Sequence, residues 1–241
     1  MIHTIADTHT HTVVSGHAYS TLTENLKAAS ERGLRFLGST EHTGLMPHAA
    51  HEYYFTNMGV VPDELFGVHL LRGCEVNIIG NDGELDVSDK ILSKLEWVIA
   101  SMHIPVYQPS DFDGHTSAWM GVLKNPQVDV LGHPGDGRYV FDYETVIKAC
   151  GEYGKIVEIN SHSFGNRPGS TENCRTIALL CKKYGIPVVV NSDAHFWASI
   201  GEHTNALRML EEIDFPEELI VNADYRRFAD LITEKTGRIF E

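Results

Sequence analysis

Histidine and carboxylate side chains, the residue types that bind divalent metal ions in proteins, recur at a regular spacing in this chain. They stand where short apolar runs end. Counted from His9, the run ends lie 27 to 33 residues apart, with Asn160 at the one run end that lacks a strong ligand. That interval is the length of a β-strand plus a crossover helix. The pattern predicts side chains gathered at the same end of successive parallel strands, namely Asp7, His9, His11, His42, Glu75, His103, His133, Asp193 and His195.

The first and last run ends carry paired ligands. Side chains two positions apart on an extended segment point the same way, so Asp7, His9 and His11 are expected to share a face. The same holds for Asp193 and His195. In a closed barrel the last strand lies beside the first, which would bring the two groups together. Neutral imidazoles with a few carboxylates suit zinc, and also manganese or iron. Asp7 is expected either to bind metal or to orient a ligating histidine.

Alternating strands and helices are needed to position these ligands. Several runs are apolar on both faces, as buried parallel strands require, and glycines follow the expected helices. The pattern predicts a closed or nearly closed α/β barrel forming one domain over residues 1–241, with a hairpin turn at 81–83 and a long aromatic loop at 46–57. Strands are expected at 4–7, 34–40, 69–75, 97–101, 128–132, 156–159 and 187–191. Helices are expected at 22–32, 62–66, 143–153, 171–184, 201–213 and 225–236.

Composition excludes several classes of partner. The 241 residues carry a formal charge of −14, which argues against general binding to nucleic acid or to anionic membrane surfaces. No apolar stretch approaches the roughly 18–20 residues of a membrane span, and the first residues do not resemble a signal peptide. The four cysteines form no CxxC pair and are expected to be packing residues. A reduced, cytoplasmic location is therefore expected.

The ordered motifs resemble those of a known family, the PHP (polymerase and histidinol phosphatase) domain. The resemblance covers essentially the whole chain and rests on the motifs DTHTH at 7–11, EH at 41–42, Glu75, SMH at 101–103, GHP at 132–134 and SDAH at 192–195. It is greatest to the small stand-alone YcdX-type phosphatases, through HAYSTL at 17–22, GCEVN at 73–77 and a set of residues between Glu158 and Arg175.

The resemblance implies a distorted seven-stranded β/α barrel, similar to a TIM barrel, that holds three divalent metal ions, commonly zinc. By this analogy, one ion takes His9, His11, Glu75 and Asp193. A second ion shares Glu75 and takes His103 and His133, and a third takes His17, His42 and His195. His17 follows from the resemblance alone, because it falls in the loop after the first strand.

Such a centre suits phosphate ester hydrolysis. Two neighbouring metal ions can hold a bridging hydroxide for in-line attack on phosphorus, with Glu75 and Asp193 as the carboxylates that hold it in place. Arg167 and Arg138 follow the sixth and fifth expected strands and are candidates to bind phosphate oxygens. The expected substrate is a phosphate monoester of a small metabolite. No side chain stands out as the general acid for the leaving group.

Three other functions stay open at this point. One is hydrolysis of phosphodiesters or nucleic acid ends, against which the acidic composition counts. Another is C–N hydrolysis of the amidohydrolase type, although the fourth expected strand ends in Ser101-Met102-His103 where many such enzymes carry a bridging lysine. The last is a metal-binding regulatory protein without turnover. The sequence identifies neither the substrate, nor the native metal, nor the oligomeric state.

Overall fold

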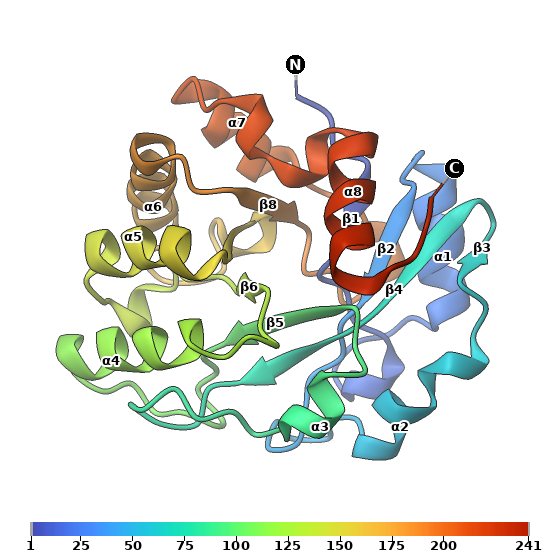
Figure 1. Cartoon of the computed structure of the whole chain (residues 1–241), viewed down its shortest axis with the longest axis horizontal. Coiled ribbons are helices and arrows are strands. Elements are labelled where there is room, and N and C mark those ends of the chain that lie inside the picture. The colour runs from blue at the N-terminus through green and yellow to red at the C-terminus, as the bar shows by residue number, and fades with distance from the viewer. Residues whose placement is uncertain (1, 241) are drawn as a thin grey trace.

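Seven parallel strands form the centre of the molecule in the computed structural model, which describes residues 2–240 (Figure 1). Their order in the sheet is their order in the chain, as a barrel built from strand–helix repeats requires. The strands are β1 (Ala6–Asp7), β2 (Phe36–Ser39), β4 (Val68–Asn77), β5 (Trp97–Ser101), β6 (Val130–Leu131), β7 (Ile156–Asn160) and β8 (Val188–Asn191). The predicted seven-stranded α/β barrel is confirmed.

The barrel is nearly closed between its first and last strands. Just beyond β1, Thr10 pairs with Ala194 in a parallel bridge, and the His11 amide donates to the Ala194 carbonyl at 2.9 Å. The Thr8 amide donates to Asn191 Oδ1 at 2.8 Å. These contacts place the HxH segment directly beside the DxH segment, although about 180 residues separate them in the chain.

Helices surround the sheet, and their ends follow local sequence signals. Thr21 and Glu24 form a reciprocal capping box at the start of the first helix, and Gly154 and Gly185 end two others in the left-handed conformation. The helices are α1 (Leu22–Glu31), α2 (Glu52–Asn57), α3 (Asp89–Leu92), α4 (Phe112–Leu123), α5 (Tyr143–Tyr153), α6 (Ser170–Tyr184), α7 (Thr204–Glu212) and α8 (Tyr225–Thr236).

Two expectations about elements were wrong. The helix expected at 62–66 is absent, because this segment contains β3 (Glu64–Leu65), which pairs antiparallel with β4. Within the loop expected at 46–57, residues from Glu52 onward form α2. The predicted hairpin turn is confirmed, since Ile78 bridges Leu85 and the Ile79 amide donates to the Glu84 carbonyl at 2.9 Å.

Helix α8 closes the amino-terminal end of the barrel. Phe228 lies in edge contact with Phe36 of β2 at 5.0 Å between ring centroids, and 5.9 Å from Trp97 of β5. All seven parallel strands contribute buried apolar residues to this cluster. Because this end is filled with apolar side chains, polar chemistry is confined to the opposite, carboxyl end. The α8 contributors are Phe228, Ala229 and Ile232, and the strand residues are Ala6, Phe36, Leu71, Trp97, Ile99, Val130, Ile156 and Val189.

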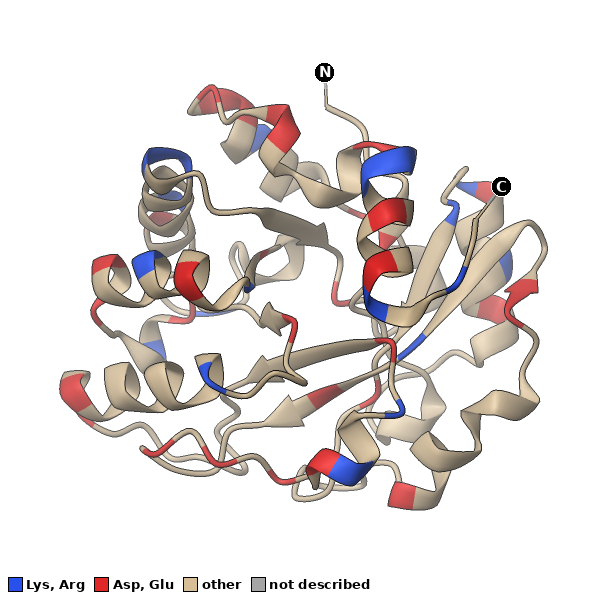
Figure 2. Cartoon of the chain, in the orientation of Figure 1, with Lys and Arg blue, Asp and Glu red and all other residues tan. Residues whose placement is uncertain are grey.

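The molecular surface agrees with the acidic composition. Figure 2 shows Asp and Glu on α3, α7 and α8, interspersed with Lys and Arg. Within residues 2–240, no helix is both long and apolar enough to cross a membrane. All four cysteines are buried and free of disulfide bonds, as expected for packing residues.

Candidate metal centre

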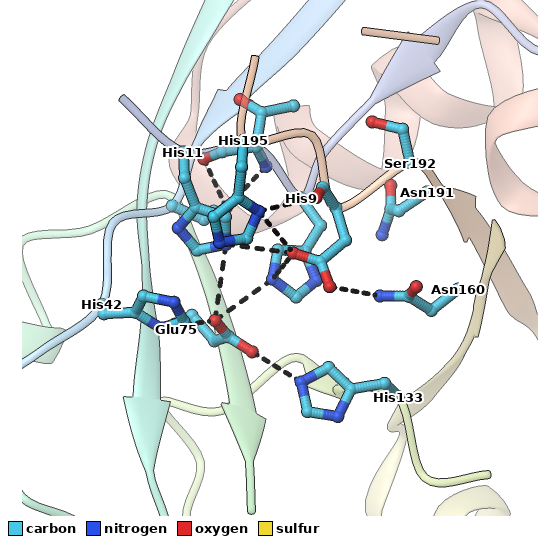
Figure 3. Close-up of polar contacts among 12 residues, drawn as sticks. His9, His11, His42, Glu75, His133, Asn160, Asn191, Ser192 and His195 are labelled. Carbon is cyan, nitrogen blue, oxygen red and sulfur yellow. Dashed lines mark hydrogen bonds and ion pairs between the residues drawn. The ribbon is translucent and has the colours of Figure 1, made fainter. Parts of the chain in front are cut away.

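Glu75, at the carboxyl half of β4, is the centre of the polar cluster. Its carboxylate is fully buried and is surrounded by imidazoles from other segments of the chain (Figure 3). Its Oε1 lies 2.9 Å from His133 Nε2 and 3.2 Å from His103 Nε2. The other oxygen, Oε2, lies 2.8 Å from His42 Nδ1, 3.3 Å from His9 Nε2 and 3.5 Å from His11 Nε2.

Asp193 closes the cluster from the segment after β8. Its Oδ1 lies 3.2 Å from His11 Nε2 and 3.6 Å from His9 Nε2. Its Oδ2 accepts hydrogen bonds from Arg167 Nη2 at 2.9 Å and from Asn160 Nδ2 at 3.2 Å. The backbone of Asp193 has a φ of 55°, which is strained for a residue with a side chain. Such strain is typical of functional sites, where the surrounding structure fixes an otherwise unfavourable backbone.

The exposed edge of the cluster contains His17, His42 and His195. His195 Nε2 lies 3.0 Å from His17 Nε2, and the rings of His17 and His42 are stacked with 5.0 Å between centroids. A short 3₁₀ helix (Val13–Ser15) followed by Gly16 at φ 75° turns the chain so that His17 reaches this edge. The nine ligand candidates are therefore gathered in one region.

The buried donor atoms fit divalent cations. Four of them make no hydrogen bond of favourable geometry to any described residue, namely His9 Nε2, His11 Nε2, His42 Nδ1 and Glu75 Oε2, although each of the three nitrogens lies within ion-pair distance of that oxygen. Leaving buried polar atoms unpaired is costly, so their grouping indicates a bound partner that coordinates them. Three sets of ligand atoms lie within 4.8 Å of one another: His9, His11 and Asp193; His11, His42 and His195; and His42, Glu75 and His103.

Local electrostatics favour the ligand forms of several groups. Burial, together with the nearby His42 and His195, lowers the pKa of His11 well below its ordinary value, so its imidazole is neutral. Burial opposes ionisation of Glu75, yet the surrounding histidines, His9 first, hold the pKa of this carboxyl well below its usual range. Burial also opposes protonation of His9, but Glu158 and Glu75 raise the pKa of that histidine well above its ordinary value. A cation binding at His9 Nε2 would displace that proton.

Hydrogen bonds behind the cluster fix which ring nitrogen faces inward. His9 Nδ1 donates to Glu158 Oε1 at 2.7 Å, which leaves Nε2 directed at the cluster. The amide of His133 donates to the other Glu158 oxygen at 2.6 Å. Similarly, His103 Nδ1 lies 2.8 Å from Asn77 Oδ1. The spacing of ligand types assigned no role to Glu158 or Asn77, although Asn77 lies two positions after Glu75 on β4 and Glu158 two positions before Asn160 on β7.

Asp7 does not orient a ligating histidine. Its carboxylate accepts hydrogen bonds from the backbone amides of Ser192 at 3.1 Å and Gly201 at 2.7 Å, and lies 3.6 Å from His203 Nε2. Strand β1 ends at Asp7, so the side-chain alternation that placed Asp7 with His9 does not extend across this point. The carboxylate that accepts from the ring of a ligand candidate is instead Glu158, bonded to His9 Nδ1.

A cavity of about 480 Å³ opens over the exposed edge of the cluster. Both predicted substrate-binding arginines line it, Arg167 from the loop after β7 and Arg138 from the loop after β6. Several predicted ligands form its floor, and Tyr19, Met46, Ile104 and Phe196 add apolar surface. One cavity is therefore lined by candidate metal ligands, two guanidinium groups and apolar side chains.

Comparison with known proteins identifies the family. The family model of the PHP domain matches residues 7–162, and that of the PHP-associated region matches residues 171–223. The chain belongs to the PHP family. The PHP-associated segment contributes β8, which pairs with β7 of the PHP segment. That residues 1–241 form one domain stays a prediction.

Curated relatives of this PHP protein match over nearly their full length. A probable phosphatase of Clostridium novyi is 44% identical over 232 residues, covering 96% of this chain and 95% of the relative. A probable phosphatase of Acetivibrio thermocellus is 43% identical over 235 residues, covering 98% of each. The crystal structure of histidinol phosphate phosphatase from Lactococcus lactis, complexed with zinc, L-histidinol and phosphate, superposes with a TM-score of 0.63. It covers 88% of this chain and 95% of the other at 16% identity, which supports the fold.

Proposed function

We propose that this PHP protein is a metal-dependent phosphatase that hydrolyses phosphate monoesters of a small metabolite. The observation that carries the proposal is the set of unpartnered, buried His and Glu atoms below a cavity lined by two arginines. Cations held there beside guanidinium groups would attract and neutralise a phosphate dianion. The names of the curated relatives, probable phosphatases, support the same reaction class.

Three divalent ions would occupy the cluster in this proposal, with zinc favoured and manganese or iron as alternatives. His9, His11, Glu75 and Asp193 would hold one. Glu75 would be shared with a second at His103 and His133, and His17, His42 and His195 would hold the third. When bound, such ions supply Lewis-acid charge and acidify a water for attack on phosphorus. The zinc in the histidinol phosphate phosphatase structure supports this choice of metal.

The protein side chains have separate roles in this proposal. Glu75 and Asp193 would neutralise part of the cation charge, and their contacts with His9 and His11 hold these side chains together. Glu158 holds His9 in its ligating orientation. Arg167 donates to Asp193 and lines the cavity, so it lies where the reacting phosphate would enter.

Paired substrates test the proposal. The zinc- or manganese-loaded protein is assayed with p-nitrophenyl phosphate and with bis(p-nitrophenyl) phosphate. We expect the monoester to be preferred, activity to be lost with a chelator, and activity to return when metal is added. A preference for the diester would instead favour the phosphodiesterase alternative. Turnover of a cyclic amide without turnover of either ester would favour an amidohydrolase.

A further inference from the structure

The two cavity arginines differ in what they contact. Arg167 has a side chain only 14% exposed, and its Nη2 and Nη1 donate to Asp193 and Ser163 at 2.9 and 3.0 Å. Arg138 is 39% exposed and contacts neither Asp193 nor any other ligand candidate in the structure's described part. Its partner is Asp136. The two arginines are therefore not equivalent members of one phosphate clamp.

Asp136 fixes the position of Arg138. This carboxylate is buried, accepts from the Arg138 amide at 3.0 Å, and accepts from Arg138 Nε at 2.9 and 3.0 Å through its two oxygens. Arg138 Nη2 also donates to it. Arg138 Nε and Nη2 both donate hydrogen bonds to Asp136, so Nη1 is the guanidinium nitrogen without a protein acceptor among residues 2–240. The Arg138 side chain lines the cavity. The backbone contact and the side-on pair hold it in a preset orientation.

Ion pairs connect Arg138 to Asp193 through two intervening charged residues. Asp193 pairs with Arg167, Arg167 Nε lies 3.9 Å from Asp136, and Asp136 pairs with Arg138. The two loops are joined as well, because the Gly137 amide donates to the Pro168 carbonyl at 2.8 Å. A side chain at position 137 would place its Cβ 2.4 Å from that oxygen, so glycine is required there. Arg167 and Asp136 therefore stand between Asp193 and Arg138 in this series of contacts.

Within the described part of the chain, Asp193 is the only carboxylate that lines the cavity. That carboxylate is paired with Arg167, so it is already engaged, and the free nitrogen of Arg138 belongs to another side chain that lines the cavity. An arginine with an unused, oriented nitrogen in such a space recognises an anionic group. Because Arg167 pairs with the ligand candidate Asp193 and Arg138 contacts no ligand candidate among the described residues, we assign Arg138 to a group other than the phosphate that reacts.

We propose that Arg138, held by Asp136, recognises a second anionic group on the leaving group, so that the substrates are small phosphate esters carrying an additional carboxylate or phosphate. This inference rests on the proposed phosphatase function. It assigns Arg167 to the reacting end of the substrate and Arg138 to the distal end.

Binding of phosphonates tests this assignment without turnover, because their C–P bond is not hydrolysed. Propylphosphonate and 3-phosphonopropionate differ only in a terminal methyl or carboxylate. Calorimetry on the zinc-loaded protein should show that 3-phosphonopropionate binds about tenfold tighter or more, as expected for one charge-assisted hydrogen bond. In Arg138→Gln, this ratio should fall to about one, while propylphosphonate binding stays unchanged.

A matched control is available on α6. Arg175 has a side chain 40% exposed and pairs with Glu212 at 3.0 Å, away from the cavity, so Arg175→Gln should keep the wild-type ratio. Ethane-1,2-bisphosphonate, in which a second phosphonate replaces the carboxylate, tests which anion is preferred, and its affinity should likewise depend on Arg138. Equal weakening of both monophosphonates by Arg138→Gln would overturn the inference and place Arg138 on the reacting phosphate. A wild-type protein that does not distinguish the two probes would also overturn it.

Hydrolysis separates this inference from the proposed function. 3-Phosphoglycerate and glycerol 3-phosphate offer the same contrast between a charged and an uncharged end as esters. A binding preference that depends on Arg138, together with no hydrolysis of any monoester, would reject the phosphatase proposal while leaving the anion site in place. Hydrolysis of both esters with equal efficiency, unaffected by Arg138→Gln, would reject the anion site alone.

Discussion

At the residue scale, the spacing of ligand types predicted most of the cluster. His9 and His42 follow strands and Glu75 lies in the carboxyl half of β4, so their positions could be predicted from the strand–helix repeat. His17 could not be predicted this way, because a 3₁₀ turn and Gly16, which no strand periodicity describes, bring it to the cluster. The supporting hydrogen bond from His9 to Glu158 depends on which strands are neighbours across the barrel, and its partners lie 149 residues apart.

Replacing Glu158 by Gln tests this support. The amide can occupy the same space but cannot accept from His9 Nδ1 with the strength of a carboxylate, so the histidine is held less well. We expect activity or metal affinity to fall about 10- to 100-fold with the fold retained. Metal titration and phosphate release measure the effect. The exposed Glu31→Gln variant is the control, and an unchanged Glu158→Gln enzyme would show that this hydrogen bond does not support the site.

At the element scale, the seven parallel strands and helices α1, α5, α6, α7 and α8 agreed with the sequence, whereas α4 and the segment that contains β3 did not. Helix α4 was not expected, because Gly114 and Gly121 weaken its helical signal. Gly121 is needed there for packing, since a Cβ would lie 2.0 Å from the Asp82 carbonyl oxygen in the hairpin turn. Strand β3 was expected to be helical because two residues are too few for a strand pattern.

Substitution of Gly16 tests whether the turn after β1 positions His17 at the cluster. Alanine at this position would adopt a φ of 75° and place its Cβ 2.4 Å from His48 Cβ, so the turn must move. We expect Gly16→Ala to lose the ion assigned to His17, His42 and His195, lowering bound zinc from three ions to two by elemental analysis.

The control for Gly16 is Gly33, which has the same φ, but a Cβ added there would meet no atom within 4 Å. Gly33→Ala should carry only the backbone cost, roughly 1–2 kcal/mol, and keep its full metal content. Equal metal content in both variants would contradict the role given to the Gly16 turn.

At the scale of the whole molecule, the barrel has one apolar end and one polar end. One face of β7 shows this, because Ile156 at the amino end joins the apolar cluster beneath α8 (the apolar plug), while Glu158 and Asn160, on the same face nearer the carboxyl end, join the polar cluster. The sequence predicted helix 225–236 but not its position over the barrel, because this contact depends on the curvature of the closed sheet. Family and barrel predictions are confirmed, whereas the three-ion assignment stays a prediction.

Phe228 on α8 tests the apolar plug. The side chain is fully buried, so Phe228→Ala should reduce the free energy of unfolding by about 3–5 kcal/mol in denaturant titration. The folded fraction should keep its activity, because the plug lies at the opposite end from the cluster. Phe112→Ala, at a half-exposed position, should change stability by only about 0.5 kcal/mol or less. A small effect at Phe228 would contradict the plug.

The reactivity of the four buried cysteines with a thiol reagent measures whether the protein is folded. Burial raises the pKa of Cys150 and of Cys174 to about 12, so the reactive thiolate is scarce in the folded protein at pH 8. Unfolding returns these thiols to a pKa of about 8.5. We expect slow reaction with a thiol reagent in native buffer and reaction of all four cysteines in denaturant. Rapid labelling of the native protein at pH 8 would contradict the burial of Cys150 on α5 and of Cys174 on α6.

The central claim is that imidazoles and carboxylates from segments throughout the barrel hold a cluster of metal ions together. Anomalous diffraction at the zinc edge from a crystal of the zinc-loaded protein measures this directly. We predict three peaks, each surrounded by side chains from the set His9, His11, His17, His42, Glu75, His103, His133, Asp193 and His195. A crystal without peaks among these residues, or with zinc bound only elsewhere on the molecule, would contradict the account.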